Sequence, residues 1–237
     1  MDLLKKLRSI YPNCKLRIAN YFMNIIILGP QGSGKGTQAK MLAEKFGLEH
    51  VEMGKLLRDV AKLDSPLGKK VHETINIQGK LVENRVIEEV LDAKLDGLPS
   101  EKGIIFDGVP RSESQREYIE RKIAQMGRKI ESVIDINLPE EETIERLSKR
   151  WVCENEHVLI MGKDVKGVNE KCPICGSEIR QRIDDTPERI KTRLDIYHKD
   201  TKPVIDYYRG QGILIEIDGR PSIKEVSEDI LKKIKRI

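Results

Sequence analysis

Five short apolar runs alternate with longer, charged segments along this chain of 237 residues. Each run has the length and composition of a buried strand, and the five lie at 24–28, 48–53, 103–107, 132–138 and 213–218. The segments between them carry apolar residues three and four positions apart, which predicts helices. Continuous apolar strands with long crossovers form parallel sheets that are covered on both faces. We therefore expect an α/β fold in which helices flank a five-stranded parallel sheet.

The last predicted helix is the clearest one. Ser222 and Glu225 form a capping box, in which each side chain bonds the backbone N–H of the other residue. An apolar stripe at helical spacing follows, formed by Ile223, Val226, Ile230, Ile234 and Ile237. A stripe of this kind faces the core.

The charges of the chain nearly balance, with 43 lysines and arginines against 39 aspartates and glutamates, a net charge of +4. This excess is too small to indicate a nucleic-acid partner by itself. No apolar run approaches the roughly 20 residues that span a bilayer, so we expect no membrane-embedded segment. The cysteines are too few and too unevenly spread for the disulfide framework of a small secreted protein. We therefore expect a cytoplasmic protein.

A glycine-rich loop follows the first apolar run, in the stretch GPQGSGKGTQ at 29–38. The spacing from Gly29 to Gly34 and Lys35 matches a phosphate-binding loop between a strand and a helix. Glycines let successive N–H groups point inward, and the lysine reaches the outer phosphates. Gly36 stands where the usual pattern has Ser or Thr, so Thr37, one place later, is the candidate magnesium ligand. The expected core is P-loop NTPase-like, which leaves switches, motors and kinases open.

The loop resembles that of the adenylate kinase family of nucleoside monophosphate kinases. Further motifs of that family follow in order: LLRD at 56–59, GKLV at 79–82, DGVPRSESQ at 107–115, RLSKR at 146–150, RIDD at 182–185 and KTRL at 191–194. The resemblance covers Met23 to about Lys233. It implies a magnesium-dependent enzyme that reversibly transfers the γ-phosphoryl group of ATP to AMP, giving two ADP.

Phosphoryl transfer requires an in-line acceptor, exclusion of water and neutralisation of spreading negative charge. The resemblance implies that this work falls to a catalytic set: Lys35, Asp107, Arg111, Arg146, Arg150, Arg182 and Arg193. In the family scheme Arg58 and Arg111 grip the acceptor phosphate, and Asp107 orients magnesium. The arginines of the RLSKR motif reach the donor, whereas Arg182 and Arg193 close over the transferring group.

The resemblance also assigns the two nucleotide sites. The ATP site is expected to comprise Gly32, Ser33, Gly34, Lys35, Gly36, Thr37, Arg146 and Arg150. The AMP site is expected to comprise Met53, Arg58, Lys80, Leu81, Val82, Gly108, Val109, Pro110, Arg111, Gln115, Arg182 and Arg193.

Acceptor specificity rests on Gln115, which falls where adenylate kinases read the adenine. Its carboxamide both donates and accepts hydrogen bonds, which suits an adenine edge. Uridylate and cytidylate kinases usually carry asparagine near this position, so they are the alternative. Three residues at 53–55, Met-Gly-Lys, replace the family's usual Thr-Gly-Asp, and Val109 replaces a common aromatic residue.

Three cysteines and one histidine lie in the segment after the RLSKR motif. Cys153 and His157 form C-x3-H, and Cys172 and Cys175 form a C-P-I-C-G knuckle whose tight turn aims two thiolates at one ion. Zinc favours sulfur and nitrogen ligands, so His157 is the expected fourth ligand, with Glu156 as the alternative. Such a zinc is structural, because a small insertion with few apolar residues needs metal ligation to fold.

These motifs divide the chain. Residues 1–22 are an extension of unknown role before an internal start at Met23; 23–52, 82–149 and 183–237 form the core; 53–81 bind the monophosphate; and 150–182 form a lid. Asp184 and Asp185 can cap the helix near Pro187, and the resemblance implies that they form salt bridges with the closing lid; the two roles are compatible. The expected state is a monomer that binds ATP and AMP. Two other classes are alternatives: a zinc-containing nucleic-acid-binding protein, and a nucleotide-sensing switch without turnover.

Overall fold

A computed structural model of the chain describes residues 23–77, 82–99, 101–182 and 185–234. The predictions for residues 1–22, Lys80, Leu81, Asp184 and Ile237 therefore lie outside the described residues. Within the described part, every helix is too short or too polar to cross a bilayer.

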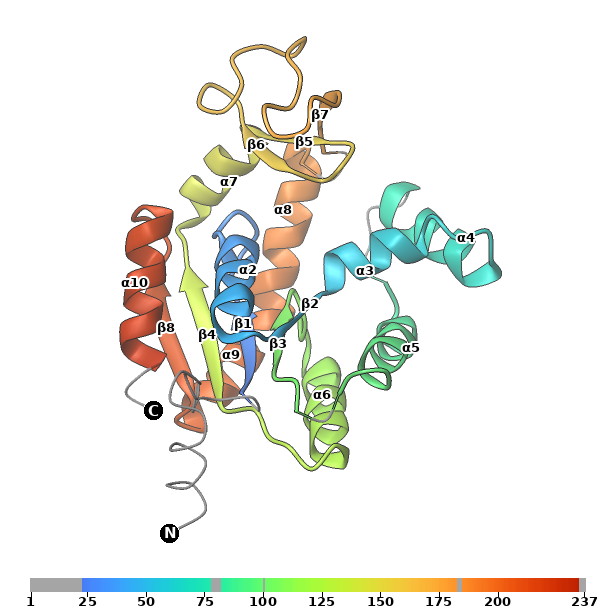
Figure 1. The fold of residues 1–237 in the computed structure, drawn as a ribbon, viewed down its shortest axis with the longest axis vertical. Coiled ribbons are helices and arrows are strands. Elements are labelled where there is room, and N and C mark those ends of the chain that lie inside the picture. Colours follow the sequence, from blue (N-terminus) through green and yellow to red (C-terminus); the bar gives the residue numbers. More distant parts are fainter. Residues whose placement is uncertain (1–22, 78–81, 100, 183–184, 235–237) are drawn as a thin grey trace, which may run out of the picture.

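The core is a five-stranded sheet made of β1 (Asn24–Leu28), β2 (Glu49–Glu52), β3 (Ile104–Asp107), β4 (Ser132–Asn137) and β8 (Leu214–Asp218). The strand order is β2-β3-β1-β4-β8, and every neighbouring pair is parallel. Figure 1 shows the sheet in the middle of the molecule with helices on both sides. The predicted strands and their parallel arrangement are confirmed.

The two faces of the sheet bury alternate residues of the same strands. In β1, Ile25 and Ile27 pack with α2 (Lys35–Phe46) and α10 (Ile223–Ile234). Ile26 and Leu28 belong to the cluster on the opposite face, which is covered by α5 (Asn84–Leu95), α6 (Glu113–Gln125) and α9 (Lys202–Gly210). All four β1 side chains are at most 3% exposed, so each contributes about 2 kcal/mol of burial free energy.

The capping box of α10 is confirmed. The Ser222 N–H donates to Glu225 Oε2 at 3.0 Å, and the Glu225 N–H donates to Ser222 Oγ at 3.3 Å. Val226 and Ile230 are buried, but Ile223 is 56% exposed, so its place in the buried stripe was wrong. Ile223 lies in the first turn of the helix, and periodicity identifies a face without showing how far along it the core extends.

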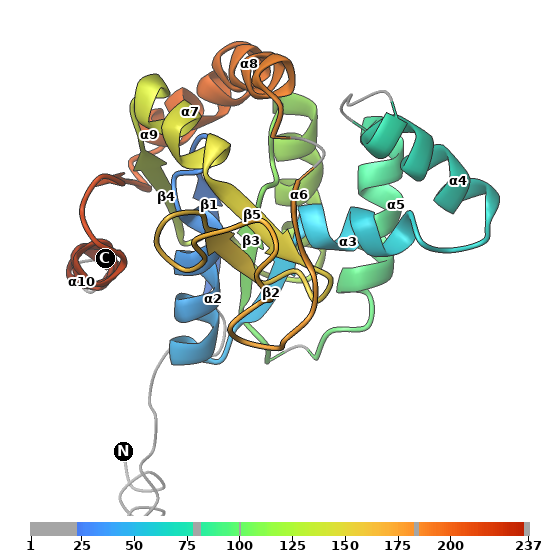
Figure 2. The same cartoon turned by 90° about the horizontal axis from the view of Figure 1, so that it is seen from above.

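The segment after β2 is helical, as expected. It contains α3 (Met53–Val60), α4 (Pro66–His72) and a wider π-helical turn at Glu73–Ile77. Met53, Leu57 and Val71 belong to the same buried cluster as α5, so this segment is anchored to the core at its base. Figure 2 shows α3 and α4 beside the sheet.

A second excursion leaves the core after α7 (Glu140–Ser148). It forms an antiparallel sheet of β5 (Arg150–Cys153), β6 (Val158–Ile160) and β7 (Ile179–Gln181), and the chain returns through α8 (Pro187–Ile196) and a π-helical turn at Tyr197–Thr201. The insertion was expected, but its strands were not. In Figure 1 the insertion lies above the ends of the central strands, and we call residues 150–182 the lid.

Candidate active site and metal centre

The glycine-rich loop joins the end of β1 to the start of α2. Gly29, Gly32 and Gly34 have φ angles of 137°, 79° and 89°, which side chains rarely tolerate. A Cβ on Gly29 would also lie 2.5 Å from the carbonyl oxygen of Ile136. Gly34 gives α2 no side-chain cap, and the uncapped N–H groups at the start of a helix suit the binding of an anion.

Lys35 is the first residue of α2, and its Nζ donates to the carbonyl oxygen of Pro30 at 3.2 Å. Burial lowers the pKa of Lys35 to about 8; Asp107 opposes this shift, and Arg111, Arg193 and Arg150 add to it. The predicted lysine and three predicted arginines therefore lie within electrostatic reach of one another.

Asp107 ends β3 and is 5% exposed. Its Oδ2 lies 3.3 Å from His50 Nε2, a partner that the sequence reasoning missed. A Cβ on residue 36 would lie 3.2 Å from the same oxygen, which explains the glycine after the lysine. Thr37, in the first turn of α2, is exposed. Carboxylate and hydroxyl oxygens are donors of the kind magnesium prefers, so the side-chain chemistry of Asp107 and Thr37 fits this ion.

The loop after Asp107 is held by hydrogen bonds around Arg111. Arg111 Nε donates to the Gly108 carbonyl at 2.8 Å, and the Arg111 N–H donates to Gln115 Oε1 at 2.8 Å. Gln115 Nε2 in turn donates to Asn84 Oδ1 at 2.9 Å. Asn84 was not predicted, and only the fold brings it to Gln115, 31 positions later in the chain. The side chain of Gln115 is therefore fixed in orientation.

One pocket brings predicted residues from several motifs together. Its lining includes Lys35, Gly108, Pro110, Arg111 and Arg193. Arg146 reaches the glycine-rich loop as well: its Nη1 donates to the Gly32 carbonyl at 3.5 Å, and its Nη2 to the Arg220 carbonyl at 3.3 Å.

At the base of the lid, Asp185 is shared by two predicted arginines. Arg150 donates through Nε and Nη2 at 2.7 and 2.6 Å, and Arg193 donates through Nη1 at 3.2 Å. Thr186 caps α8 through its side chain, so the capping role was wrong for Asp185 and the salt bridge is correct. Arg182 follows β7 directly, and its carbonyl accepts the N–H of Asp185 at 3.1 Å. It does not belong to the described pocket lining.

The expected acceptor-site residues divide by burial. Met53, Val82 and Val109 are at most 9% exposed and belong to the core cluster, so packing occupies their side chains. Arg58, on α3, donates to Glu156 of the lid: Nε to Oε1 at 2.9 Å and Nη2 to Oε2 at 3.3 Å. The sequence reasoning did not pair these residues, which lie 98 positions apart.

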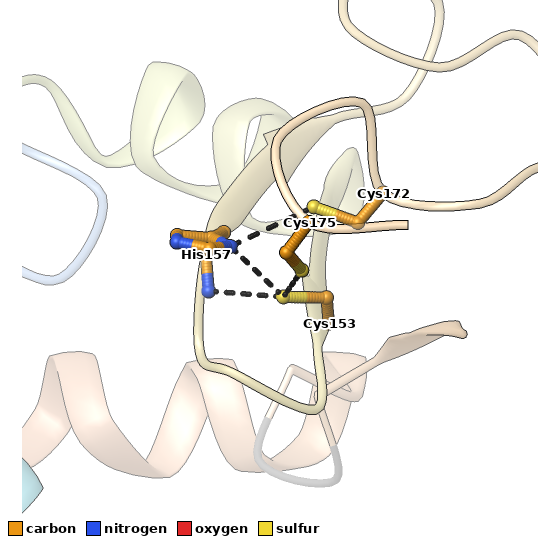
Figure 3. A group of neighbouring side chains, drawn as sticks. All are labelled: Cys153, His157, Cys172 and Cys175. Carbon is orange, nitrogen blue, oxygen red and sulfur yellow. Dashed lines mark hydrogen bonds between the residues drawn. The ribbon is translucent and has the colours of Figure 1, made fainter. Parts of the chain in front are cut away.

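The lid gathers the four predicted zinc ligands in one place (Figure 3). The ligand atoms of Cys153, His157, Cys172 and Cys175 all lie within 4.8 Å of one another. Cys153 Sγ is 3.3 Å from His157 Nδ1 and 3.7 Å from Cys175 Sγ. Tetrahedral zinc with bonds of about 2.3 Å sets two sulfurs about 3.8 Å apart, so this cluster is compatible with a structural zinc. Glu156 points to Arg58 instead, which favours His157 as the fourth ligand.

Comparison with known proteins identifies the family of this chain. The family model for adenylate kinase matches residues 27–213. A Dehalococcoides mccartyi adenylate kinase is 41% identical over 212 residues, covering 90% of this chain and 98% of the relative. The adenylate kinase of Archaeoglobus fulgidus is 39% identical over 219 residues, covering 90% and 100%. That of Caldicellulosiruptor bescii is 36% identical over 216 residues, covering 90% and 99%. The chain therefore belongs to the adenylate kinase family, and it is a phosphotransferase of the nucleoside monophosphate kinase class.

Proposed function

We propose that the pocket between the glycine-rich loop and Arg111 carries out the reversible transfer of a phosphoryl group from ATP to AMP. The observation that carries the proposal is the convergence of Lys35, Arg111 and Arg193 on one pocket. Cationic groups from separate segments are what a transition state with charge spread over the transferring group requires.

Each group has a proposed task. Lys35 and the N–H groups at the start of α2 hold the donor phosphates, and Arg146 and Arg150 extend this grip. Arg58 and Arg111 hold the acceptor phosphate, and Arg182 and Arg193 close over the transferring group. Arginine suits these positions because its planar fork binds phosphate oxygens in pairs. Magnesium, held by Asp107 and Thr37, would supply further neutralisation of phosphate charge.

AMP is the proposed acceptor because of the bonding capacity that Gln115 retains. Its carboxamide offers two N–H donors and an oxygen with two lone pairs. One donor is directed at Asn84 and one lone pair accepts from Arg111, which leaves one of each for a base. This pair matches the adjacent donor and acceptor on adenine. The alternative acceptors are UMP and CMP.

We further propose the division into a core (23–52, 82–149 and 183–237), a monophosphate-binding insertion (53–81) and a lid (150–182). The lid's own small buried cluster, formed by Cys153, Leu159, Val165, Cys172 and Ile179, supports a separate unit. A monomer is proposed because predicted catalytic residues of a single chain, Lys35, Arg111 and Arg193, already converge on one pocket. A cytoplasmic location is proposed because the three cysteines in the described part of the chain are thiols, which are typical of reducing compartments. We propose neither a nucleic-acid nor a membrane partner.

The test is a coupled assay for ADP formation from ATP and magnesium, with AMP, UMP, CMP and GMP offered in parallel. Strong turnover with AMP is expected, and turnover only with another monophosphate would overturn the acceptor assignment. Gln115→Ala should lower kcat/KM for AMP by about tenfold or more, because it removes the carboxamide that is proposed to hydrogen-bond the adenine base. Gln125→Ala, at an exposed position of the same helix, is the control and should leave it unchanged.

A further inference from the structure

The lid places a carboxylate on the arginine that is proposed to bind the acceptor phosphate. Glu156 Oε1 and Oε2 accept from Arg58 Nε and Nη2 at 2.9 and 3.3 Å, and Arg58 Nη2 also lies 3.4 Å from Glu52 Oε1. This two-point contact is the geometry in which a guanidinium binds two oxygens of a phosphate. Glu156 therefore occupies the same donor atoms that an acceptor phosphate would use.

The contact bridges two parts of the molecule. Arg58 lies on α3, whereas Glu156 lies in the turn between β5 and β6 of the lid. Their side chains are 28% and 31% exposed, so the pair is partly shielded from solvent.

The turn that carries Glu156 is braced on both sides. The Glu156 N–H donates to the Cys153 carbonyl at 2.9 Å, and the Cys153 N–H donates to the His157 carbonyl at 3.2 Å. Glu156 itself has φ 62°, a left-handed conformation found in no other non-glycine residue of the described part. Its neighbours Cys153 and His157 belong to the zinc-type cluster. The carboxylate is thus presented by a fixed turn.

The surface that receives Glu156 is basic. Lys55 and Lys62 flank Arg58 on and just after α3, and both hydrogen-bond Asp59, at 2.7 and 3.0 Å. Lys55 stands where the family usually has an aspartate, so this departure adds positive charge below the lid turn. Glu156 bonds Arg58 directly, and the two lysines, each paired with Asp59, add only a longer-range electrostatic attraction.

We propose that Glu156 is a built-in competitor of the acceptor nucleotide, which holds the lid to α3 until the phosphate of AMP displaces it from Arg58. The inference rests on the proposed function, because it takes Arg58 as the acceptor-phosphate grip. Glu156 acts by weakening AMP binding and by coupling release of the lid turn to the arrival of AMP.

The test compares Glu156→Gln with Glu154→Gln, which removes the same charge from an exposed position of the same turn. Glu156→Gln should lower the KM for AMP about threefold to fivefold, the effect of losing a partly exposed ion pair, and leave the KM for ATP unchanged. Glu154→Gln should change neither constant. Glu156→Gly, which suits the left-handed backbone, should reproduce the drop. An unchanged or raised KM for AMP in both Glu156 variants would overturn the proposal.

Two further measurements distinguish the competitor role of Glu156 from a role as metal ligand, and test it separately from the proposed kinase function. Both Glu156 variants should retain zinc, and loss of the metal would overturn the proposal. Adding AMP without ATP should speed backbone hydrogen exchange at residues 154–157 in the wild type but not in Glu156→Gln. If AMP does not change hydrogen exchange at residues 154–157 of the wild type, the competitor role of Glu156 is wrong, even where the coupled assay shows turnover. If AMP speeds that exchange but no turnover is seen, only the kinase assignment is wrong.

Discussion

Asp185 accepts hydrogen bonds from Nε and Nη2 of Arg150, at 2.7 and 2.6 Å, and is itself only 2% exposed. The lid begins at Arg150 and ends just before Asp185, so this pair closes the lid at its base. Arg193 approaches the same carboxylate at 3.2 Å. One buried anion therefore aligns two of the proposed catalytic cations.

Asp185→Asn should destabilise the protein and slow catalysis together. Removing one partner of a buried ion pair leaves uncompensated charge and costs about 3 kcal/mol or more. We expect a lower free energy of unfolding and a lower kcat, because the two arginines lose their common orientation. Denaturant unfolding and steady-state kinetics measure these effects. Asp64→Asn, whose partner Lys69 is 75% exposed, is the control and should change stability by less than about 0.5 kcal/mol.

Donor binding should weaken above pH 8 because of Lys35. Burial lowers the pKa of this lysine to about 8, so the free enzyme loses the charge as pH rises through that value. Calorimetric titration with Mg-ATP between pH 7 and 9.5 should show the association constant falling, whereas AMP affinity, held by arginines, should stay level. An equal decline for both nucleotides would point away from Lys35.

Removing the metal should unfold the lid while the core stays folded. The lid buries a small apolar cluster, so metal ligation supplies much of its folding free energy. We expect one zinc per chain by elemental analysis, a lower Tm after chelation and rapid hydrogen exchange confined to 150–182. His157→Ala should lose the metal and His157→Cys should keep it. A His157→Ala protein with full zinc content would assign the fourth ligand elsewhere.

A buried carboxylate in β4 should make stability depend on pH. Asp135 is 2% exposed, and burial, reinforced by Glu216, raises its pKa to about 6. Because the pKa of Asp135 is higher in the folded than in the unfolded state, its contribution to the free energy of unfolding is fully present below about pH 4. That contribution is lost as the pH rises through about 6. Asp135→Asn should therefore raise the free energy of unfolding at pH 8 by about 3 kcal/mol, and the gain should vanish near pH 4. Exposed Asp195→Asn serves as the control, with no such trend.

The parts of the structure that depend on local pattern were predictable from the sequence. A continuous apolar run indicates a buried parallel strand, and the spacing of glycines indicates a phosphate-binding loop that leads into a helix. β1, α2 and the cysteine knuckle could therefore be predicted from short stretches of sequence. The strands β6 and β7 have three residues each, too few to show a period. Contacts between segments that are distant in the sequence could not be predicted from local pattern either. His50 meets Asp107, Asn84 meets Gln115 and Glu156 meets Arg58 only because the fold juxtaposes them.

The pairing of β5 with β7 brings the two ends of the lid together, with Trp151 opposite Gln181. The chain thus departs from the core and returns to it through neighbouring positions on one small sheet. Because both ends are fixed on this sheet, a change in the length of the insertion between them need not move the segments on either side. Exchange of whole lids between related enzymes then requires a match at this one junction, and lid chemistry can evolve separately from the phosphate-binding core.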